Sequence, residues 1–418
     1  MNNTIIHRDA ASTVVERLAI HSLVFLLPFL ALISNFGVGF CSFAFLLAAI
    51  VYWRAGRVAL LRHLSEIRGV LIAFGLSFGL ALAQMLLRHD LLRTLEKPSR
   101  EMAAVTVLLT VLACRPNRKA LWYGLIAGAL AGAAFIVYQR WVMGVDRPGG
   151  LINSITFGDI VLCMGLMSLA GVLDFKGRQV VWPSLGALAG VVGSIATGTR
   201  GGWIAILFAI ALFLQYGHFV RGKSIKAMAL LVLVLLAGSW YIPQTGARAR
   251  IYEGVNDVET YVNGGSVFTH MGIRFELWKG ATMLIARHPW GGATLPEVRA
   301  ELAGLVAERQ LDPVVTIMPH FHNDVLQELV FGGIPGLLVW ASTLLMPLLF
   351  FLRILRTHES ASAPRVALAL AGMMLVLGYF SFGLTEVIFF SVRSTMFYAL
   401  MLFLIMGLCL NVKDHDGQ

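Results

Sequence analysis

The sequence predicts an all-α polytopic membrane protein of about twelve transmembrane helices with one large, partly helical extracytoplasmic loop. Hydrophobic residues make up 58% of the 418 positions and charged residues only 13%, whereas roughly a quarter of the residues in soluble domains are charged. The mean hydropathy is +0.77. The apolar runs recur regularly at the length of membrane-spanning helices, so a helical bundle is favoured over the short, alternating strands of a β-barrel.

Apolar runs and polar breaks give the expected helices in order. Lys and Arg set their orientation, because short cytoplasmic loops are enriched in these residues. With the amino terminus inside, the cytoplasmic segments hold 18 of them and the short outer loops hold 8. Both termini are therefore expected in the cytoplasm. The expected spans cover residues 18–33, 37–52, 69–87, 102–114, 120–141, 155–173, 182–197, 203–217, 226–242, 325–352, 366–385 and 394–411.

This topology divides the chain into three parts. Residues 1–242 would hold the first nine spans, 243–324 the extracytoplasmic loop, and 325–418 the last three spans and a cytoplasmic tail. Most connections are far shorter than such a loop, and long ones tend to be functional. The net charge of +10 comes from short basic clusters between apolar runs, which is typical of the positive-inside bias and not of nucleic-acid binding. All four cysteines lie in or beside apolar runs, so no disulfide is expected.

The end of the long loop holds the strongest candidates for catalysis. It reads MPHFHND and places His320, His322, Asn323 and Asp324 directly before a new apolar helix. Asp324 and Gln327 form a plausible capping box, with His322 just outside the helix N-terminus. The positive end of the helix dipole favours the neutral imidazole that a general base needs, and it attracts phosphate. A histidine that only caps the helix is the alternative.

Glycine and proline interrupt the chain on both sides of this motif. The segment ARHPWGGA at 286–293 is expected to turn sharply at Pro289 and the paired glycines. The cluster formed by Gly332, Gly333, Pro335 and Gly336 should break or kink the tenth span. Such a break is tolerated only where protein or a cavity receives the backbone.

Within the loop, residues 272–281 predict an amphipathic helix that carries Arg274 and Trp278 on one face. A membrane-surface helix with a snorkelling Arg274 is an equal alternative. A second, more polar helix is expected at 295–310. The apolar stripe of the first helix consists of Ile273, Leu277, Ala281 and Leu284.

Arg200 lies in TGTRGGW, at the outer mouth of the seventh and eighth spans. Flanking glycines let a ligand approach the backbone, and a guanidinium suits a pyrophosphate or carboxylate. A tight hairpin with an interfacial arginine explains the same residues. Asp159 and Glu386 are carboxylates at membrane depth, where acids usually serve function, and they could orient Arg or His side chains. The two histidines alone are a weak metal signal, and no metal site is expected.

These features together resemble the O-antigen ligase and polymerase superfamily. The shared features are many spans, one large late loop, an Arg-Gly-Gly-Trp hairpin, and a loop ending in His-x-His-Asn before a kinked helix. Lipopolysaccharide O-antigen ligases are the most similar members. The resemblance runs from about residue 150 onward and rests on TRGGW and HFHND, and the first four or five spans carry no recognisable motif.

The resemblance implies a glycosyltransferase of the inner membrane, similar to the lipid-donor (GT-C-like) membrane glycosyltransferases. Members move a polysaccharide from undecaprenyl pyrophosphate to a sugar hydroxyl of lipid A-core at the periplasmic face. The implied partners are undecaprenyl pyrophosphate-linked O-antigen, the lipid A-core acceptor and membrane lipids, with no ATP, cofactor or metal. A monomer is expected.

The resemblance also implies roles for individual residues. His322 corresponds to the catalytic histidine, with His320 the next candidate. Arg200 and Arg274 would bind the pyrophosphate, and Arg147 in the DRPGG loop is a weaker candidate for the same role. The supporting residues would be Asn323, Asp324, Trp278, Asp159 and Glu386.

Three alternatives remain at this point. An O-antigen polymerase shares the loop but elongates the glycan on its carrier, so it differs in acceptor. A protein O-oligosaccharyltransferase uses the same donor with a Ser or Thr acceptor, and no soluble extension that would dock a protein is evident. A flippase or secondary transporter would explain twelve spans with Asp159 and Glu386 at membrane depth. It would not explain why the candidate base and anion-binding groups gather on one face of the membrane.

Overall fold

The computed structural model describes residues 2–88, 91–199, 201–216, 241, 247–356 and 362–416. Throughout these ranges the regular structure is helical, and no strand occurs in them. Helices α1 to α10 cover Asn2–Ile33, Gly37–Val51, Trp53–Arg62, Leu64–Arg88, Glu96–Ala103, Val105–Cys114, Lys119–Val137, Ser154–Ala170, Val181–Thr197 and Trp203–Tyr216. Helices α12 to α17 cover Ala247–Val262, His270–Arg287, Leu295–Ala307, Asp324–Arg356, Ala363–Gly383 and Val392–Asp416.

Seven helices in the described ranges are long and apolar enough to cross a membrane. The pair α2 and α3, which meet at 90°, would make an eighth if they form one span. The seven are Leu64–Arg88, Lys119–Val142, Ser154–Leu173, Gly177–Thr197, Asp324–Arg356, Ala363–Gly383 and Val392–Val412.

These seven match seven of the twelve predicted spans. Four other predicted spans fall on apolar helices that are shorter than a span or bent within the described residues: Leu18–Ile33, α2, α6 and α10. The predicted span at 226–242 lies almost wholly outside the described residues. The prediction of twelve spans is therefore matched in helix position but not in the number of helices long enough to cross.

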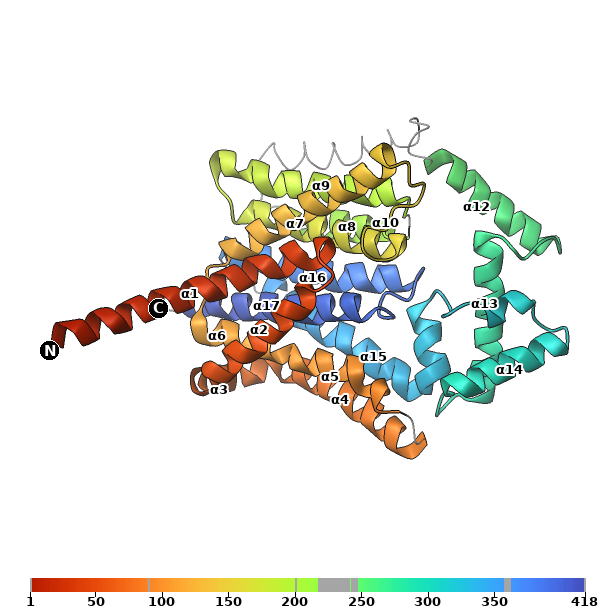
Figure 1. Ribbon diagram of the computed structural model, residues 1–418, viewed down its shortest axis with the longest axis horizontal. Helices are drawn as coiled ribbons and strands as arrows, with labels where there is room; N and C mark the ends of the chain where they lie inside the picture. The colour runs from red at the N-terminus through yellow and green to blue at the C-terminus, as the bar shows by residue number, and fades with distance from the viewer. Residues whose placement is uncertain are drawn as a thin grey trace.

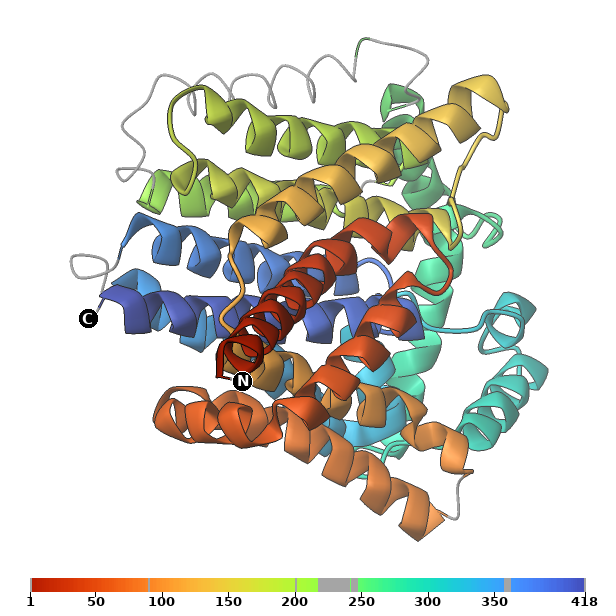
Figure 2. The same cartoon turned by 60° about the vertical axis from the view of Figure 1, so that its left-hand side comes forward.

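Helices α16 and α17 form the centre of the bundle. Both are buried along almost their whole length in the described residues. Helices α7 to α10 lie on one side of them, and α4 and α5 lie on the opposite side (Figures 1 and 2). The start of α1 and the end of α17 lie at one end of the bundle, and α12 to α14 lie at the other (Figure 1).

Small residues bring α8 and α9 into close contact. A Cβ on Gly165 of α8 would lie 2.8 Å from the Cα of Gly190 of α9. A Cβ on Gly186 would lie 2.3 Å from Ser168 Oγ. Membrane helices associate through such contacts because lipid provides no hydrophobic driving force between them.

A buried carboxylate fixes the end of the bundle that lies away from α12 to α14. Asp174 accepts two hydrogen bonds of 2.9 Å from the guanidinium of Arg118 and one of 2.7 Å from Trp122 Nε1. Bidentate Arg–carboxylate pairs are among the strongest hydrogen-bonded contacts in proteins. This contact joins the start of α7 to the turn that follows α8.

The predicted extracytoplasmic loop, called the extramembrane loop below, has a hydrophobic core of its own, formed by α13, α14 and the 3₁₀ turn Pro313–Thr316. The predicted stripe of α13 is confirmed, because Leu277, Ala281 and Leu284 are buried in this core and Ile273 packs against it. The apolar stripe of this helix therefore faces other protein side chains. The buried Glu276 accepts hydrogen bonds from Tyr261 Oη at 2.8 Å and Asp312 N at 2.9 Å, and so ties α12 and the 3₁₀ turn to α13.

The predicted break in the tenth span is confirmed. Helix α15 kinks at Gly333, whose φ of 62° and ψ of −163° are not helical. The predicted turn at 286–293 packs into this kink: Ala293 N donates to Val330 O and Ile334 N donates to Pro289 O, both at 2.8 Å. Another protein segment thus receives the backbone groups that the break releases, as membrane burial requires.

Arg88, at the end of α4, joins the same junction. Its guanidinium donates to Phe331 O at 3.2 Å and to Gly291 O. One side chain therefore connects the membrane bundle, the kinked helix and the turn.

A Gly333→Ala substitution should destabilise the protein. Alanine at a positive φ is strained by about 1–3 kcal/mol, and its Cβ would lie 2.6 Å from Trp290 O. The midpoint of thermal unfolding of the purified protein in detergent should fall by several degrees. Gly79→Ala in α4 is the control, because a Cβ there meets nothing within 4 Å. Equal midpoints for the two variants would contradict this account of the kink.

Candidate functional site

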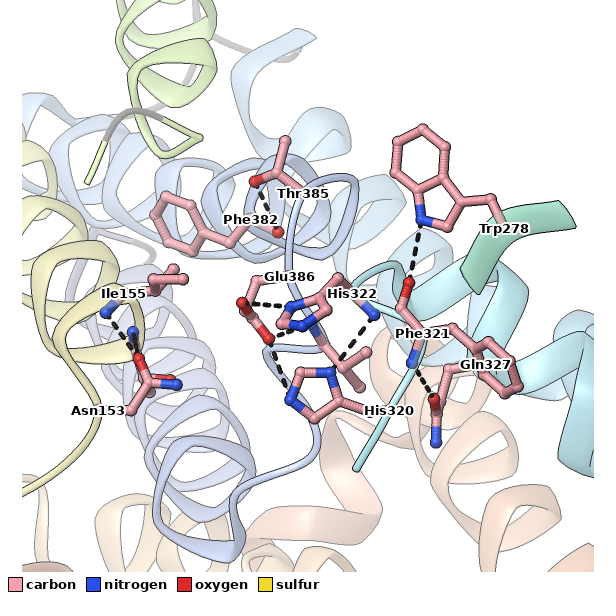
Figure 3. A network of polar contacts seen from close by, with 12 residues as sticks. Asn153, Ile155, Trp278, His320, Phe321, His322, Gln327, Phe382, Thr385 and Glu386 are labelled. Atoms are coloured by element: carbon pink, nitrogen blue, oxygen red, sulfur yellow. Dashed lines mark hydrogen bonds and ion pairs between the residues drawn. The ribbon is translucent and has the colours of Figure 1, made fainter. Parts of the chain in front are cut away.

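The centre of the candidate site is a carboxylate between two imidazoles (Figure 3). His320 and His322 lie just before α15, and Glu386 lies in the linker 384–391 between α16 and α17. His322 Nδ1 lies 3.0 Å from Glu386 Oε2, and His320 Nε2 lies 3.3 Å from Glu386 Oε1. The side chain of Glu386 is 2% exposed and that of His322 is 20% exposed. A ligand from solvent therefore meets the cluster at His322.

The contacts define which ring nitrogens hold protons. A carboxylate only accepts hydrogen bonds, so His322 Nδ1 donates to Glu386. His320 Nδ1 accepts from the backbone N–H of His322 at 3.3 Å, which leaves His320 Nε2 to carry the proton toward Glu386. Both nitrogens of His320 are therefore engaged. In the described part of the chain, Nε2 of His322 has no partner and is the basic nitrogen of the neutral ring.

Electrostatics favours this arrangement. Burial lowers the pKa of His320 to about 4, more than the attraction of Glu386 raises it, so this imidazole is neutral at pH 7. Burial acts to raise the pKa of Glu386, but the hydrogen bond from His322 and the charge interactions with both imidazoles lower it overall. Glu386 is thus an ionised carboxylate that orients the rings.

The backbone around the histidines is held from both sides. Trp278 Nε1 of α13 donates to Phe321 O at 3.0 Å, and Phe321 N donates to Gln327 Oε1 of α15 at 3.2 Å (Figure 3). His322 has a φ of 51°. Left-handed backbone is uncommon outside glycine and persists only where the surroundings impose it. Trp278 therefore supports the histidine segment from the extramembrane loop.

Asn323, not Asp324, caps α15. Asn323 Oδ1 accepts from Leu326 N at 3.1 Å, and Asn323 Nδ2 donates to Leu384 O at 3.1 Å. The predicted capping box is wrong by one residue, because Asp324 is the first helical residue and its side chain points into the bundle against Gly383. Gln327, its expected partner, binds Phe321 instead. Asn323 links the histidine segment to the linker that carries Glu386.

Arg274 and Asp159 lie close to this cluster. Burial lowers the pKa of Arg274, while the nearby carboxylates of Glu386 and Asp159 act in the opposite direction. No hydrogen bond or ion pair fixes the Arg274 guanidinium within the described residues. Asp159 on α8 is fully buried, and neither carboxylate oxygen has a hydrogen-bond partner in that same part of the chain. Arg274 is therefore a cation available to a ligand near the histidines.

The hairpin at 197–203 packs beside the same carboxylates. A Cβ on Gly201 would lie 1.9 Å from Thr385 Oγ1, and one on Gly202 would lie 2.6 Å from Asp159 Oδ1. The two glycines that follow Arg200 are therefore required for close packing against the residue before Glu386 and against Asp159. Arg200 itself lies outside the described residues.

Arg147 is exposed in the loop between Val142 and Ser154. The contacts given above for His320, His322 and Glu386 do not include it. Its role in binding pyrophosphate remains a prediction.

Lys97 contributes to the site but was missed from the sequence. Its ammonium, on α5, donates to Phe389 O at 2.9 Å and Phe390 O at 3.0 Å. The Phe390 ring packs 4.9 Å from the ring of His320. Lys97 thus holds the linker that presents Glu386. The only available signal was a lysine within a polar run before an apolar helix, which is typical of any exposed loop end.

The two histidines and Glu386 also have the composition of a metal site. One ligand atom from each lies within 4.8 Å of the others, and a two-histidine, one-carboxylate set suits divalent transition metals. The hydrogen bonds described above use the same atoms, and the charge of Arg274 disfavours a nearby cation. The expectation of no metal remains a prediction.

Residues 185–341 match the sequence model of the family described as O-antigen ligase. This range includes the hairpin, the extramembrane loop, both histidines and the kink of α15. A protein of Haemophilus influenzae described as uncharacterised is 24% identical over 304 residues, which are 71% of this chain and 75% of that protein. The family match supports membership of the O-antigen ligase superfamily.

Proposed function

We propose that this member of the O-antigen ligase superfamily transfers O-antigen polysaccharide from undecaprenyl pyrophosphate to a sugar hydroxyl of lipid A-core. The reaction takes place at the periplasmic face of the bacterial inner membrane. The observation that carries the proposal is the Glu386 carboxylate bonded to Nδ1 of His322, with the opposite nitrogen of that ring unengaged in the described residues.

His322 is the general base. Its Nε2 takes the proton of the acceptor hydroxyl as the oxygen attacks the anomeric carbon of the donor. The bond from that carbon to the pyrophosphate breaks, and undecaprenyl pyrophosphate leaves with the electron pair. Glu386 holds the ring in the tautomer that accepts a proton at Nε2 and stabilises the imidazolium that forms. His320 keeps Glu386 in place from its other oxygen.

Cationic side chains stabilise the leaving group. Arg274 supplies a guanidinium next to the histidine cluster, and two adjacent N–H groups of a guanidinium can bind a phosphate in bidentate fashion. Arg200 is the second cation of the proposal, on the hairpin whose glycines pack against Asp159 and Thr385. Asp159 attracts Arg274 through its nearby charge, without a hydrogen bond in the described residues. Cations positioned where charge develops stabilise the transition state more than the ground state.

The reaction should proceed in one step with inversion at the anomeric carbon. The cluster contains one carboxylate, and both of its oxygens contact imidazoles, so it is not placed as a nucleophile. Comparison of donor and product by NMR should show opposite anomeric configurations of the transferred sugar. Retention of configuration would require a covalent intermediate and would contradict this mechanism.

A His322→Ala variant should lose transfer. Loss of a general base typically lowers the rate by about 10²–10⁴-fold. The measurement is a lipopolysaccharide ladder on a gel, from a strain that lacks the gene and is complemented with wild type or variant. Long glycan should be missing from lipid A-core and should accumulate on the lipid carrier.

His270→Ala is the matched control, because His270 is exposed at the start of α13 and belongs to the same loop. Normal ligation by a well-expressed His322→Ala protein would rule out the mechanism. If single repeat units still reach the core and only chain length collapses, the protein is the polymerase of this superfamily and its acceptor is a growing glycan.

Chelation should leave the rate of transfer unchanged. The donor already contains a good leaving group, and His322 with the arginines supplies both the base and the charge that the reaction needs. Purified enzyme assayed with and without EDTA should give equal rates. A lost rate that returns with Zn²⁺ would assign the His320, His322 and Glu386 cluster to a catalytic metal instead.

A further inference from the structure

A cavity of about 230 Å³ lies between α4, α5, α15 and α17. Its polar lining includes Gln84, Lys97, Glu101 and Glu328, and its aromatic lining includes Trp340 and Tyr398. Phe389 of the linker 384–391 forms part of its wall. The cavity shares this linker with the site of His320, His322 and Glu386.

The linker 384–391 lies between the helices that line the cavity and α8, which carries Asp159 (Figure 1). Helices α4 and α5 lie below α16 and α17 in Figure 1, whereas α8 and α10 lie above them. Asp159 of α8 interacts electrostatically with Arg274, and the hairpin before α10 packs against Asp159. Lys97 of α5 binds the carbonyls of Phe389 and Phe390 from the cavity side. The linker therefore has Asp159 on one side and the cavity with Lys97, Glu101 and Glu328 on the other.

The polar groups of the cavity suit hydroxyl groups better than phosphate. Lys97 attracts both Glu101 and Glu328, and Ser77 forms a hydrogen bond with Glu101. The remaining carboxyl oxygens can accept hydrogen bonds from the hydroxyl groups of a ligand. Two of the three donors of the Lys97 ammonium are used by backbone carbonyls. A phosphate in this cavity would find only one free N–H of Lys97 and would lie beside the acceptor oxygens of Glu101 and Glu328.

The remaining lining suits a sugar ring. Trp340 offers aromatic surface for the C–H face of a ring, and Gln84 offers both a donor and an acceptor for its hydroxyls. The indole N–H of Trp340 is buried and has no hydrogen-bond partner in the described part of the chain. The volume is below the roughly 300–1,000 Å³ of pockets for drug-sized ligands, so the cavity is sized for a small group such as one ring.

We propose that this cavity binds an uncharged sugar ring of the acceptor glycan. The inference rests on the proposed transfer function and deepens it. In a displacement with inversion the attacking hydroxyl and the leaving pyrophosphate lie on opposite faces of the anomeric carbon. With the pyrophosphate at Arg274, the acceptor approaches from the side of α5. Glu101 and Glu328 then accept hydrogen bonds from the hydroxyl groups of the acceptor sugar.

The kinetic test compares two substitutions on one helix. Glu101→Gln keeps the shape of the side chain and removes the charge that faces the cavity. Glu96→Gln is the control, because Glu96 makes an exposed pair with Arg100 on α5 and does not line the cavity. With purified enzyme, Glu101→Gln should raise the KM for the acceptor about tenfold or more and leave the KM for the donor unchanged. An unchanged acceptor KM, or a raised donor KM, would overturn the proposal.

A binding test separates this proposal from the proposed function. Thr94→Cys places a thiol in the cavity lining, in a His322→Ala background that should not turn over. Delipidated core oligosaccharide should slow the labelling of this thiol by a maleimide, because it covers the thiol. Introducing Glu101→Gln into the same protein should remove this protection. The same protein without Thr94→Cys gives the background from its own cysteines.

The outcomes distinguish the two claims. Protection without transfer by the wild-type enzyme would support the cavity as a sugar site and contradict the proposed function. Transfer by the wild type with no protection of the thiol and no change in acceptor KM would overturn the cavity proposal alone.

Discussion

The exchange of backbone hydrogen bonds at the kink of α15 determines where the extramembrane loop sits. A helix broken at Gly333 leaves backbone groups without helical partners, and at membrane depth each such group is costly. The turn that contains Pro289 and Ala293 satisfies them, and Arg88 secures the turn to α4. The loop is thus bonded to the bundle on two sides of the break. The histidine segment lies between this loop and α15, so the same hydrogen bonds determine where it lies.

A second constraint acts on the site itself. Glu386 lies on a linker between two nearly fully buried helices, and its carboxylate contacts both imidazoles. Asn323 binds the same linker at Leu384, and Lys97 binds it at Phe389 and Phe390. The linker is therefore held from the loop side and from α5. Preorganisation of this kind lets fixed groups stabilise a transition state without reorganising during the reaction.

Much of this could be predicted from the sequence wherever the signal was local. The stripe of α13 and the kink of α15 follow from residue spacing and from glycine and proline, and each of these features is decided within a few residues. The contact of Glu386 with the histidines spans 64 residues, and that of Lys97 with Phe389 spans 292, so no local pattern reports it. The cap of α15 was misassigned because Asn323 and Asp324 are both good capping residues, and only the packing of Gly383 shows which one faces the bundle. Seven or eight of the twelve predicted spans are long and apolar enough to cross a membrane in the described residues, and the other spans remain a prediction because hydropathy alone does not distinguish a short apolar helix from a membrane-crossing one.

The position of Glu386 has a consequence for how the protein is made. Chains are synthesised from the N-terminus, and the linker between α16 and α17 follows every other described element except α17 itself. Until that linker is made, His320 and His322 lack the carboxylate that accepts from both rings. The nascent chain therefore passes through most of its synthesis with this cluster incomplete, and a fragment that ends before the linker would hold the loop and both histidines without Glu386.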